Sequence, residues 1–374
     1  MKSKSNPLYY IAELNLPNKS AYSIHVMKMC EAFSKLGYKT NLLSIKNKNL
    51  SKIFKIYNIK YNFKLISIFN KPLNLNFILR LVFTYKILTR KFEKNCIFIS
   101  RSIIFALIAS TIKKNVILEL HHQITGFSRI LFNFLKFVNL TKNLKFIFLH
   151  KKLKQFYNIT DSKSIILDDA ADIKNFKNQK NKKKLKNTCV YIGSFFEGKG
   201  IEQILRLAKL NKKIFFHIYG EKKYLKYQSI EKNIKVFDYV SYSKIPKILS
   251  QYEVALMPYQ FKVKGRSSVW IEKYMSPLKM FDYLASKMII VASDLSVYKH
   301  ILKNNFNCKL IKVNNDKNLA NEEFEIFISK HINEVEKRLN EQISNRGVVD
   351  AFQYMIEFAG YLALLSMYMW AVTY

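Results

Sequence analysis

The sequence has few of the residues that interrupt or cross-link a chain. Its 374 residues include only 9 Gly, 6 Pro and 4 Cys. So little Gly and Pro argues against a collagen-like, linker-like or low-complexity chain. The cysteines form no C-x-x-C pair, which indicates neither a zinc ribbon nor a disulfide framework and fits a reducing cytoplasm. They are Cys30, Cys96, Cys189 and Cys308.

Acidic residues are also scarce. The chain has 26 Asp+Glu against 63 Lys+Arg, a formal net charge of +37, and only eight of the basic residues are Arg. Nucleic-acid-binding proteins tend to cluster Arg, whereas here Lys is spread through nearly every segment. A biased codon supply would also produce a diffuse Lys excess. In either case the charge predicts attraction to anionic surfaces, including the cytoplasmic leaflet of a membrane, where each nearby Lys contributes about 1 kcal/mol.

Hydrophobic residues make up 49% of the chain, which is enough to form real cores. The length suggests two domains of roughly 100 to 200 residues each. After a basic start, the apolar run Leu8–Leu14 contains Glu13 and is too short for the apolar part of a signal peptide. We therefore expect it to form a first buried strand.

Two parts of the chain share one pattern of strand, polar turn, amphipathic helix and strand. In the first, Leu8–Leu14 leads to a helix whose apolar residues recur at i, i+3, i+4 and i+7, and Gly37 ends this helix before a strand at Thr40–Ile45. The helix residues are Val26, Met29, Cys30 and Phe33. A strand that returns after a helix favours a parallel sheet.

The pattern starts again at Cys189–Ile192, which is followed by a turn over Gly193–Gly200 and a second amphipathic helix. Several further apolar runs are continuous, as expected for strands covered on both faces. They are Val116–Leu120, Ile214–Tyr219, Lys235–Phe237, Val254–Met257 and Met288–Ala292. The sequence therefore predicts an α/β fold class with two doubly wound parallel sheets in series.

The boundary between the two parts is expected in the Lys-rich stretch Lys174–Asn187, which is typical of a solvated linker. We predict domains over residues 1–176 and 177–335 and a tail over residues 336–374. From Gly347 the tail has no Lys or Arg. It could pack against the domains, dip into a membrane or be foreign to them. We favour packing or interfacial contact over a span, which needs roughly 17 to 25 apolar residues.

Two segments of the first part, Asn76–Phe92 and Ser128–His150, combine aromatic and aliphatic residues with regularly spaced Lys and Arg. Ordinary helices that cover a sheet would explain both segments. The alternative is an interfacial face that meets anionic lipid.

The window Tyr274–Ala285 has the clearest local signal. Ser276 is a suitable N-cap, and Pro277 suits the first helical position because its missing N–H has no partner there. A helix that begins here would offer N–H groups and its positive dipole end to a phosphate, and Lys279 would add charge. Asp282, in the second turn, could accept hydrogen bonds from ribose hydroxyls.

The turn Gly193–Gly200 is a second candidate for anion binding. Its three glycines permit close backbone approach, and Lys199 supplies charge. It is not a Walker A loop, because Gly200 stands where Ser or Thr is required, and it is not a G-x-G-x-x-G fingerprint. A plain turn between a strand and a helix would have the same pattern.

Together these segments resemble glycosyltransferase family 4 in order and spacing over residues 8–315. The resemblance rests on Asn15–His25 with the helix up to Gly37, Tyr191–Gly200, Met257–Tyr259, Ser276–Ala285 and Ser293–Asp294. It implies a GT-B fold, in which two Rossmann-like domains face a central cleft. It also implies an acceptor site in the first domain, a nucleotide-sugar donor held mainly by the second, and a retaining transfer without a metal.

On the donor side, the family's ribose-binding Glu corresponds to Asp282, and its lysine after the Gly-rich turn to Lys199. Its backbone donors to the diphosphate correspond to Ser276 and Pro277, although Pro277 has no N–H. The chain departs from the family at Ser194, where an Arg is usual, and at Tyr274, where a Glu is usual. Neutralisation of the phosphates would then depend on Lys199, Lys279 and Arg266, and Gly193 would belong to the same donor site.

On the acceptor side, the family's small-residue loop corresponds to Ser20 and Ala21. Its strand-end histidine corresponds to His121, which follows the expected strand Val116–Leu120, and open α/β sheets bind ligands at such strand ends. We expect His121 to contact the transferred sugar, with His122 as the alternative and a structural histidine as the plain explanation. His25 matches a family position that supports the loop.

We therefore predict a cytoplasmic glycosyltransferase, peripheral at the inner face of a membrane, with His121 and Lys199 as catalytic residues. It would move a sugar from a nucleoside diphosphate to a saccharide or lipid-linked saccharide in surface-polysaccharide assembly. No metal or other cofactor is expected, since the chain has no Asp-x-Asp motif. A nucleic-acid partner is not expected either. The alternatives are a sugar-nucleotide epimerase of the same fold and a membrane-associated scaffold with weak catalysis.

Overall fold

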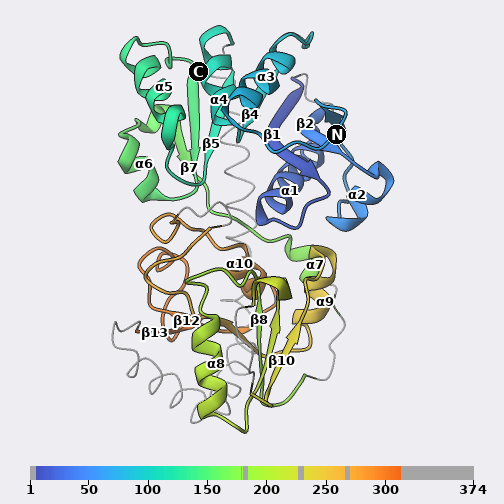
Figure 1. The fold of residues 1–374 in the computed structure, drawn as a ribbon, viewed down its shortest axis with the longest axis vertical. Coiled ribbons are helices and arrows are strands. Elements are labelled where there is room, and N and C mark those ends of the chain that lie inside the picture. Colours follow the sequence, from blue (N-terminus) through green and yellow to red (C-terminus); the bar gives the residue numbers. More distant parts are fainter. Residues whose placement is uncertain are drawn as a thin grey trace. The chain divides into compact units, whose positions relative to one another are not determined.

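The computed structural model describes residues 6–113, 115–177, 179, 184–225, 231–265 and 270–312 (Figure 1). The described chain divides into two compact units: the residues up to Asp168 together with Ser241–Ser243 form the first, and Asp169–Val240 with the residues from Lys244 onward form the second. The sequence analysis placed this boundary between residues 176 and 177, and its proposed tail over residues 336–374 lies outside the described residues. Short 3-10 helices occur at Asp161–Lys163, Lys222–Tyr224 and Tyr242–Lys244.

The first unit is built on a seven-stranded parallel sheet with the order β3-β2-β1-β4-β5-β6-β7. Its strands are β1 (Leu8–Leu16), β2 (Thr40–Asn47), β3 (Lys64–Ser67), β4 (Ile97–Ser100), β5 (Val116–Leu120), β6 (Leu144–Phe148) and β7 (Ser164–Ile166). Its helices are α1 (Ala21–Lys35), α2 (Leu50–Ile56), α3 (Phe77–Leu88), α4 (Ile103–Ile112), α5 (Gly126–Phe137) and α6 (Lys151–Tyr157).

The second unit is built on a six-stranded parallel sheet with the order β10-β9-β8-β11-β12-β13. Its strands are β8 (Thr188–Ile192), β9 (Phe215–Tyr219), β10 (Ile234–Phe237), β11 (Val254–Met257), β12 (Ile289–Ser293) and β13 (Lys309–Ile311). Its helices are α7 (Ile173–Lys177), α8 (Ile201–Leu210), α9 (Ile245–Leu249) and α10 (Leu278–Ala285). The predicted α/β architecture of two parallel sheets is confirmed.

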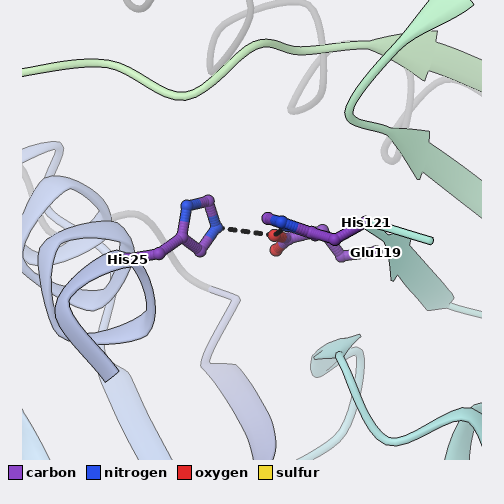
Figure 2. Close-up of side chains that lie close together, drawn as sticks. All are labelled: His25, Glu119 and His121. Atoms are coloured by element: carbon purple, nitrogen blue, oxygen red, sulfur yellow. Dashed lines mark hydrogen bonds and ion pairs between the residues drawn. The ribbon is translucent and has the colours of Figure 1, made fainter. Parts of the chain in front are cut away.

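The helix α1 shows how local sequence positions the first site. Ser20 caps it by accepting a hydrogen bond from the backbone N–H of Ser23, and Gly37 ends the segment in the left-handed region at φ 88°. The apolar stripe turns inward as predicted, since Val26, Cys30 and Phe33 are buried against the sheet. This orientation leaves His25 on the side of α1 that faces the end of β5 (Figure 2).

Two predictions on local structure were wrong. The segment Ser128–His150 is not helical throughout, because Leu144–Phe148 forms the strand β6, whose apolar run is too short to be distinguished from a helical stripe. The proposed linker also contains structure: the helix α7 buries Phe176 in the core of the second unit. Among the described residues, no helix combines the length and hydropathy that crossing a membrane requires.

Each sheet has a point where the chain changes direction across it. In the first unit this point lies between β1 and β4, and in the second between β8 and β11, because the strands added next on the two sides run outward from these pairs. In open parallel sheets, ligands bind beyond the carboxyl ends of the strands at such a switch point. The loops that follow β1, β4, β8 and β11 are therefore where function is expected.

Candidate functional site

In the second unit, the loop after β8 packs tightly against the loop after β11. A Cβ atom at Gly198 would lie 1.8 Å from the carbonyl oxygen of Lys262, and one at Gly200 would lie 1.9 Å from that of Pro258. Both glycines also have positive φ, at 78° and 85°. These glycines therefore allow two loops of the protein to approach each other, rather than a ligand to approach the backbone.

This packing places two lysines beside a group of buried tyrosines. The Nζ atom of Lys279 lies 3.6 Å from the ring centroid of Tyr191 and 5.2 Å from that of Tyr259. The Nζ atom of Lys199 lies 4.9 Å from the same Tyr259 ring. Both Nζ atoms therefore lie against the Tyr259 ring, whose electron-rich face attracts positive charge without neutralising it.

Burial disturbs the charge of both lysines. It lowers the pKa of Lys199 to about 8, and it holds the pKa of Lys279 well below the ordinary value, with the positive charge of Lys199 adding to this effect. Within the described part of the chain, the buried Nζ atom of Lys279 has no hydrogen-bond acceptor. An anionic ligand would give Lys279 the acceptor that it lacks among the described residues and would favour the charged form of both lysines.

The end of the Lys279 side chain lies directly against Gly193. A Cβ atom at Gly193 would lie 2.4 Å from the Nζ atom and 2.9 Å from the Cε atom of Lys279. The Tyr191 hydroxyl donates a hydrogen bond to the carbonyl oxygen of Ser194 at 2.8 Å, which fixes the ring over which the ammonium lies. Lys279 thus lies close to both Gly193 and Lys199, the residues with which it was grouped in the predicted donor site.

The start of α10 differs from the prediction in its capping. The helix begins at Leu278 and Pro277 is its N-cap, without a side-chain hydrogen bond, whereas Ser276 was expected to cap. The Ser276 hydroxyl instead accepts a hydrogen bond at 3.0 Å from the backbone N–H of Asp169, so it ties the beginning of the second unit to this turn. The tertiary partner outcompetes the local one, because the N–H of Asp169 is buried and requires an acceptor.

Asp282 lies in α10 as predicted and is buried. The next residue anchors the helix, since the Tyr283 hydroxyl accepts a hydrogen bond at 3.0 Å from the backbone N–H of Ile192 at the end of β8. This contact fixes the distance between α10 and the loop that carries Lys199. Arg266, the third cation of the prediction, lies outside the described residues.

In the first unit, three side chains meet at the carboxyl end of β5 (Figure 2). The Nε2 atom of His25, from α1, lies 2.5 Å from the Oε1 atom of Glu119, and the Nε2 atom of His121 contacts the same oxygen. The two imidazole rings meet edge to face with centroids 4.8 Å apart. The Tyr10 hydroxyl, from β1, donates to the other oxygen of Glu119. One buried carboxylate therefore fixes two histidines.

The charges in this cluster follow from burial and from its hydrogen bonds. Burial opposes ionisation of Glu119, but the charge of His25 and the hydrogen bonds from both histidines outweigh it and hold the pKa of Glu119 well below its usual range. Burial lowers the pKa of His121 to about 4, and the charge of Arg101 adds to this effect. At neutral pH His121 is therefore uncharged. Its Nε2–H donates to Glu119, which leaves Nδ1 as an acceptor.

The other predicted residues of the first unit have local roles in the structure. Ser20 caps α1 and its own N–H donates to the Oδ1 atom of Asn18, while Ala21 is exposed at the start of the helix. His122 makes a hydrogen bond from Nδ1 to the carbonyl oxygen of Gln123 at 2.9 Å, and burial lowers its pKa. His122 is therefore turned to the backbone, whereas His121 and His25 join Glu119.

The residue types in the Glu119 cluster could also hold a metal, since one ligand atom from each of His25, Glu119 and His121 lies within 4.8 Å of the others. Ligands of one tetrahedral ion with bonds of about 2.0–2.1 Å lie roughly 3.3 Å apart. The distance of 2.5 Å between the Nε2 atom of His25 and the Oε1 atom of Glu119 is much shorter. The observed geometry therefore fits a hydrogen-bonded cluster.

Several residues near this cluster were not singled out from the sequence. Glu13, in β1, accepts hydrogen bonds from Ser102 at 2.6 Å and from the Nε atom of Arg80 at 2.9 Å. Arg101 lies over the Tyr22 ring at 4.1 Å from its centroid. The position of Glu119 inside a buried strand was a usable signal, because a buried carboxylate needs partners.

The two units, each with a parallel sheet and its helices, together define the GT-B fold. Several solved structures share it over nearly their whole length. The complex of Anabaena HepE with UDP and glucose has a TM-score of 0.63 and 11% identity, covering 96% of this chain and 99% of that chain. Sucrose-phosphate synthase from Thermosynechococcus elongatus has a TM-score of 0.65 and 12% identity, covering 96% and 98%. A glycosyltransferase from Rickettsia africae has a TM-score of 0.62 and 14% identity, covering 97% of this chain and 98% of that chain.

Most of the second unit also matches a protein-family model. Residues 172–346 match the model described as glycosyl transferases group 1. This range contains Lys199, Lys279 and Asp282, so the predicted donor residues lie in the matched part. No curated protein matches the sequence. The fold prediction is confirmed, and these matches support the prediction of a nucleotide-sugar glycosyltransferase.

Proposed function

We propose that this protein is a retaining glycosyltransferase, related to family 4, that transfers a sugar from a nucleoside diphosphate to a saccharide or lipid-linked saccharide. The observation that carries the proposal is the Lys199–Lys279 pair. The amines of these two lysines, one of them buried without an acceptor among the described residues, lie against the Tyr259 ring in the unit that matches a glycosyltransferase model.

The donor's diphosphate is the anion that suits this pair. As the bond between the sugar's anomeric carbon and the phosphate oxygen breaks, the leaving nucleoside diphosphate gains negative charge. Cations that are already in place and shielded from water stabilise this charge without reorganising, which is usually the largest electrostatic contribution to catalysis. Lys199 and Lys279 would do so, with the N–H groups at the start of α10 as additional donors. In this proposal the charge is neutralised without a metal.

Asp282, Ser276 and Pro277 complete the proposed donor site. Asp282 would accept hydrogen bonds from the ribose hydroxyls, and the turn at Ser276 and Pro277 would position the start of α10 against the diphosphate. Arg266 would add a third cation. The complexes of HepE with UDP and with UDP-glucose support a nucleotide sugar as the ligand of this fold.

The first unit would supply the contacts to the sugar. Glu119 is a positioning residue in this proposal: it holds His121 through Nε2 so that Nδ1 can accept a hydrogen bond from a hydroxyl of the transferred sugar. The acceptor hydroxyl would form the new bond to the anomeric carbon and release its proton to the leaving phosphate oxygen. Ser20, Ala21 and His122 would shape the surroundings, and His25 would hold Glu119 from the opposite side.

The proposed surroundings follow from the charge. A protein with a net charge of +37 would collect at the anionic inner face of a cytoplasmic membrane, where a lipid-linked acceptor would be found. Surface-polysaccharide assembly would use a transferase in this location.

A thermal-shift panel of UDP, GDP and ADP tests the donor site, because a ligand that binds only the folded state raises its apparent stability. One member of the panel is expected to raise the melting temperature of the wild type and of Lys209→Ala, which removes an exposed lysine from α8. Lys199→Ala and Lys279→Met are expected to abolish the shift. An unchanged shift in both would overturn the proposal.

The reaction itself is tested by product analysis with a labelled sugar nucleotide. Transfer of the label to a saccharide with the donor's anomeric configuration, measured by NMR, supports a retaining transferase. Conversion to an isomeric sugar nucleotide without an acceptor would indicate an epimerase instead. Binding to anionic vesicles with no nucleoside diphosphate bound would indicate a scaffold.

A further inference from the structure

The helix α5 presents an apolar face to solvent that the proposed donor and acceptor chemistry does not use. Four of its large side chains are more than half exposed: Phe127 at 54%, Ile130 at 64%, Phe134 at 58% and Phe137 at 88%. Their spacing of i, i+3, i+7 and i+10 places them along one side of the helix. Val138 and Leu140, directly after α5, are exposed as well. These six residues are called the α5 face below.

Except at Phe127, whose ring meets the Phe77 ring of α3 with centroids 4.4 Å apart, this face is not the side by which α5 packs on its own unit. Phe132 and Leu135 are buried and serve that purpose, and the Phe132 ring meets Phe146 of β6 and Tyr157 of α6 edge to face. The helix therefore has two apolar sides, one inside the fold and one outside it. Figure 1 shows α5 on the outside of the first unit. Such a continuous exposed apolar stripe marks an interaction surface rather than the scattered apolar residues normal for a surface.

The charge of the chain around the α5 face indicates an anionic partner. Residues 120–160 contain seven Lys or Arg and no Asp or Glu. Arg129 and Lys136 lie on α5 itself and reach toward α6, where Arg129 lies over the Phe156 ring at 5.8 Å and Lys136 donates to the Tyr157 carbonyl oxygen at 3.4 Å. Lys142 and Lys151 are exposed nearby in the chain. Phenylalanines in a stretch of chain that is rich in cations and has no acid suit the interface of a bilayer that contains anionic lipid.

We propose that the α5 face is the surface by which this protein lies on anionic membranes, with Phe134 and Phe137 inserted at the level of the headgroups. The inference specifies the membrane association suggested above, but it does not depend on the identity of the sugar donor. The α5 face lies in the first unit, whereas Lys199 and Lys279 lie in the second.

Vesicle flotation with the full chain tests the proposal. The vesicles are phosphatidylcholine alone or phosphatidylcholine with about one third phosphatidylglycerol. The wild type is expected to float only with the anionic vesicles. The double variant Phe134→Ser/Phe137→Ser is expected to partition at least tenfold more weakly. Phe306→Ser, which removes a 49% exposed phenylalanine of the second unit, is the matched control and should float like the wild type.

Insertion and charge are tested separately. In Phe137→Trp, anionic vesicles are expected to shift the added fluorescence to the blue, as occurs when an indole leaves water. Lys142→Gln/Lys151→Gln should weaken flotation severalfold and make it less sensitive to salt. Equal flotation of the double Ser variant and the wild type, or no blue shift, would overturn the proposal.

A partner other than a membrane at the α5 face would give a different result. If a second copy of the chain covers it, the double Ser variant will convert a dimer to a monomer in sedimentation without lipid, which also overturns the proposal. The nucleoside diphosphate thermal shift of the double Ser variant should equal that of the wild type. If no nucleoside diphosphate raises the melting temperature of the wild type, the donor site is refuted. The flotation result would still support the α5 face as a membrane-binding surface.

Discussion

The ammonium group of Lys279 lies 3.6 Å above the ring of Tyr191, and no acceptor among the described residues contacts it. The ring attracts the cation but offers it no lone pair in place of water. The position therefore suits a ligand more than it suits the stability of the protein, a compromise that is common at binding sites.

Lys279→Met should stabilise the protein while removing its function. A buried donor without a partner costs about 1–3 kcal/mol, and more when charged, whereas Met keeps the length of the side chain. We expect the melting temperature to rise by a few degrees and nucleoside diphosphate binding to be lost. Calorimetric scanning of the wild type and the variant, without ligand, measures the first effect. A lower melting temperature would show that an acceptor stabilises Lys279 in the folded protein.

Nucleoside diphosphate binding should weaken as the pH rises through about 8. Burial lowers the pKa of Lys199 to about 8, so the free protein loses this positive charge between pH 7 and pH 9.5, while the diphosphate stays ionised. We expect the dissociation constant, from titration calorimetry, to rise about tenfold across this range.

The matched variant for this pH effect is Lys199→Arg, because a guanidinium keeps its charge over the same range. It should bind with a flatter pH profile even if its affinity is lower. Binding by the wild type at pH 8.5 should also take up protons, which appears as a dependence of the measured heat on the buffer. A profile for Lys199→Arg as steep as that of the wild type would exclude Lys199 as the titrating group.

Acid should destabilise the protein before its carboxylates titrate. The pKa of His121 is about 4 in the folded protein against an ordinary 6.5, so the unfolded chain binds the proton more readily between these values. Stability is therefore lost as the pH falls from 6.5 toward 4, by up to about 3 kcal/mol for this group. The contribution of Glu119 has the same sign, but it is lost only below its ordinary value of 4.5.

Urea denaturation at pH 7 and pH 5 measures this loss. His121→Asn should show a smaller difference between the two pH values than the wild type. His122→Asn is the neighbouring control, and its effect should be smaller, because the structure holds His122 at a backbone carbonyl rather than at Glu119. Identical differences for the wild type and His121→Asn would refute the assignment.

Substitutions at two glycines with positive φ distinguish the cost of backbone strain from the cost of steric conflict. Gly126→Ala adds a Cβ atom at φ 59° with nothing within 4 Å, whereas Gly200→Ala adds one at φ 85° that would lie 1.9 Å from the Pro258 carbonyl oxygen. We expect Gly126→Ala to cost about 1 kcal/mol and Gly200→Ala at least twice as much. Chemical denaturation of both variants provides the comparison, and equal costs would show that the two loops can separate without penalty.

Much of the fold follows from local pattern. The strands Val116–Leu120 and Val254–Met257 were predicted with their observed bounds, because continuous apolar runs of this length between polar turns have few other structures available. The strand β6 was missed, since Leu144–Phe148 follows a helix of similar composition and the apolar spacing does not show where one ends. The prediction that Ser276 caps α10 was wrong, because its hydroxyl accepts a hydrogen bond from Asp169, which is 107 residues away in the chain.

The sequence by itself determined the two parallel sheets, the helix that begins near Ser276 and the set of basic residues beside it, since these depend on periodicity and on neighbours in the chain. Only the tertiary structure decided which groups meet. It brought Glu119 to both His25 and His121, placed Lys279 against Gly193, and left the Phe137 side of α5 in solvent. The physical reason is that parallel strands bring the ends of distant segments to one edge of a sheet, where burial and charge depend on contacts that chain order does not encode.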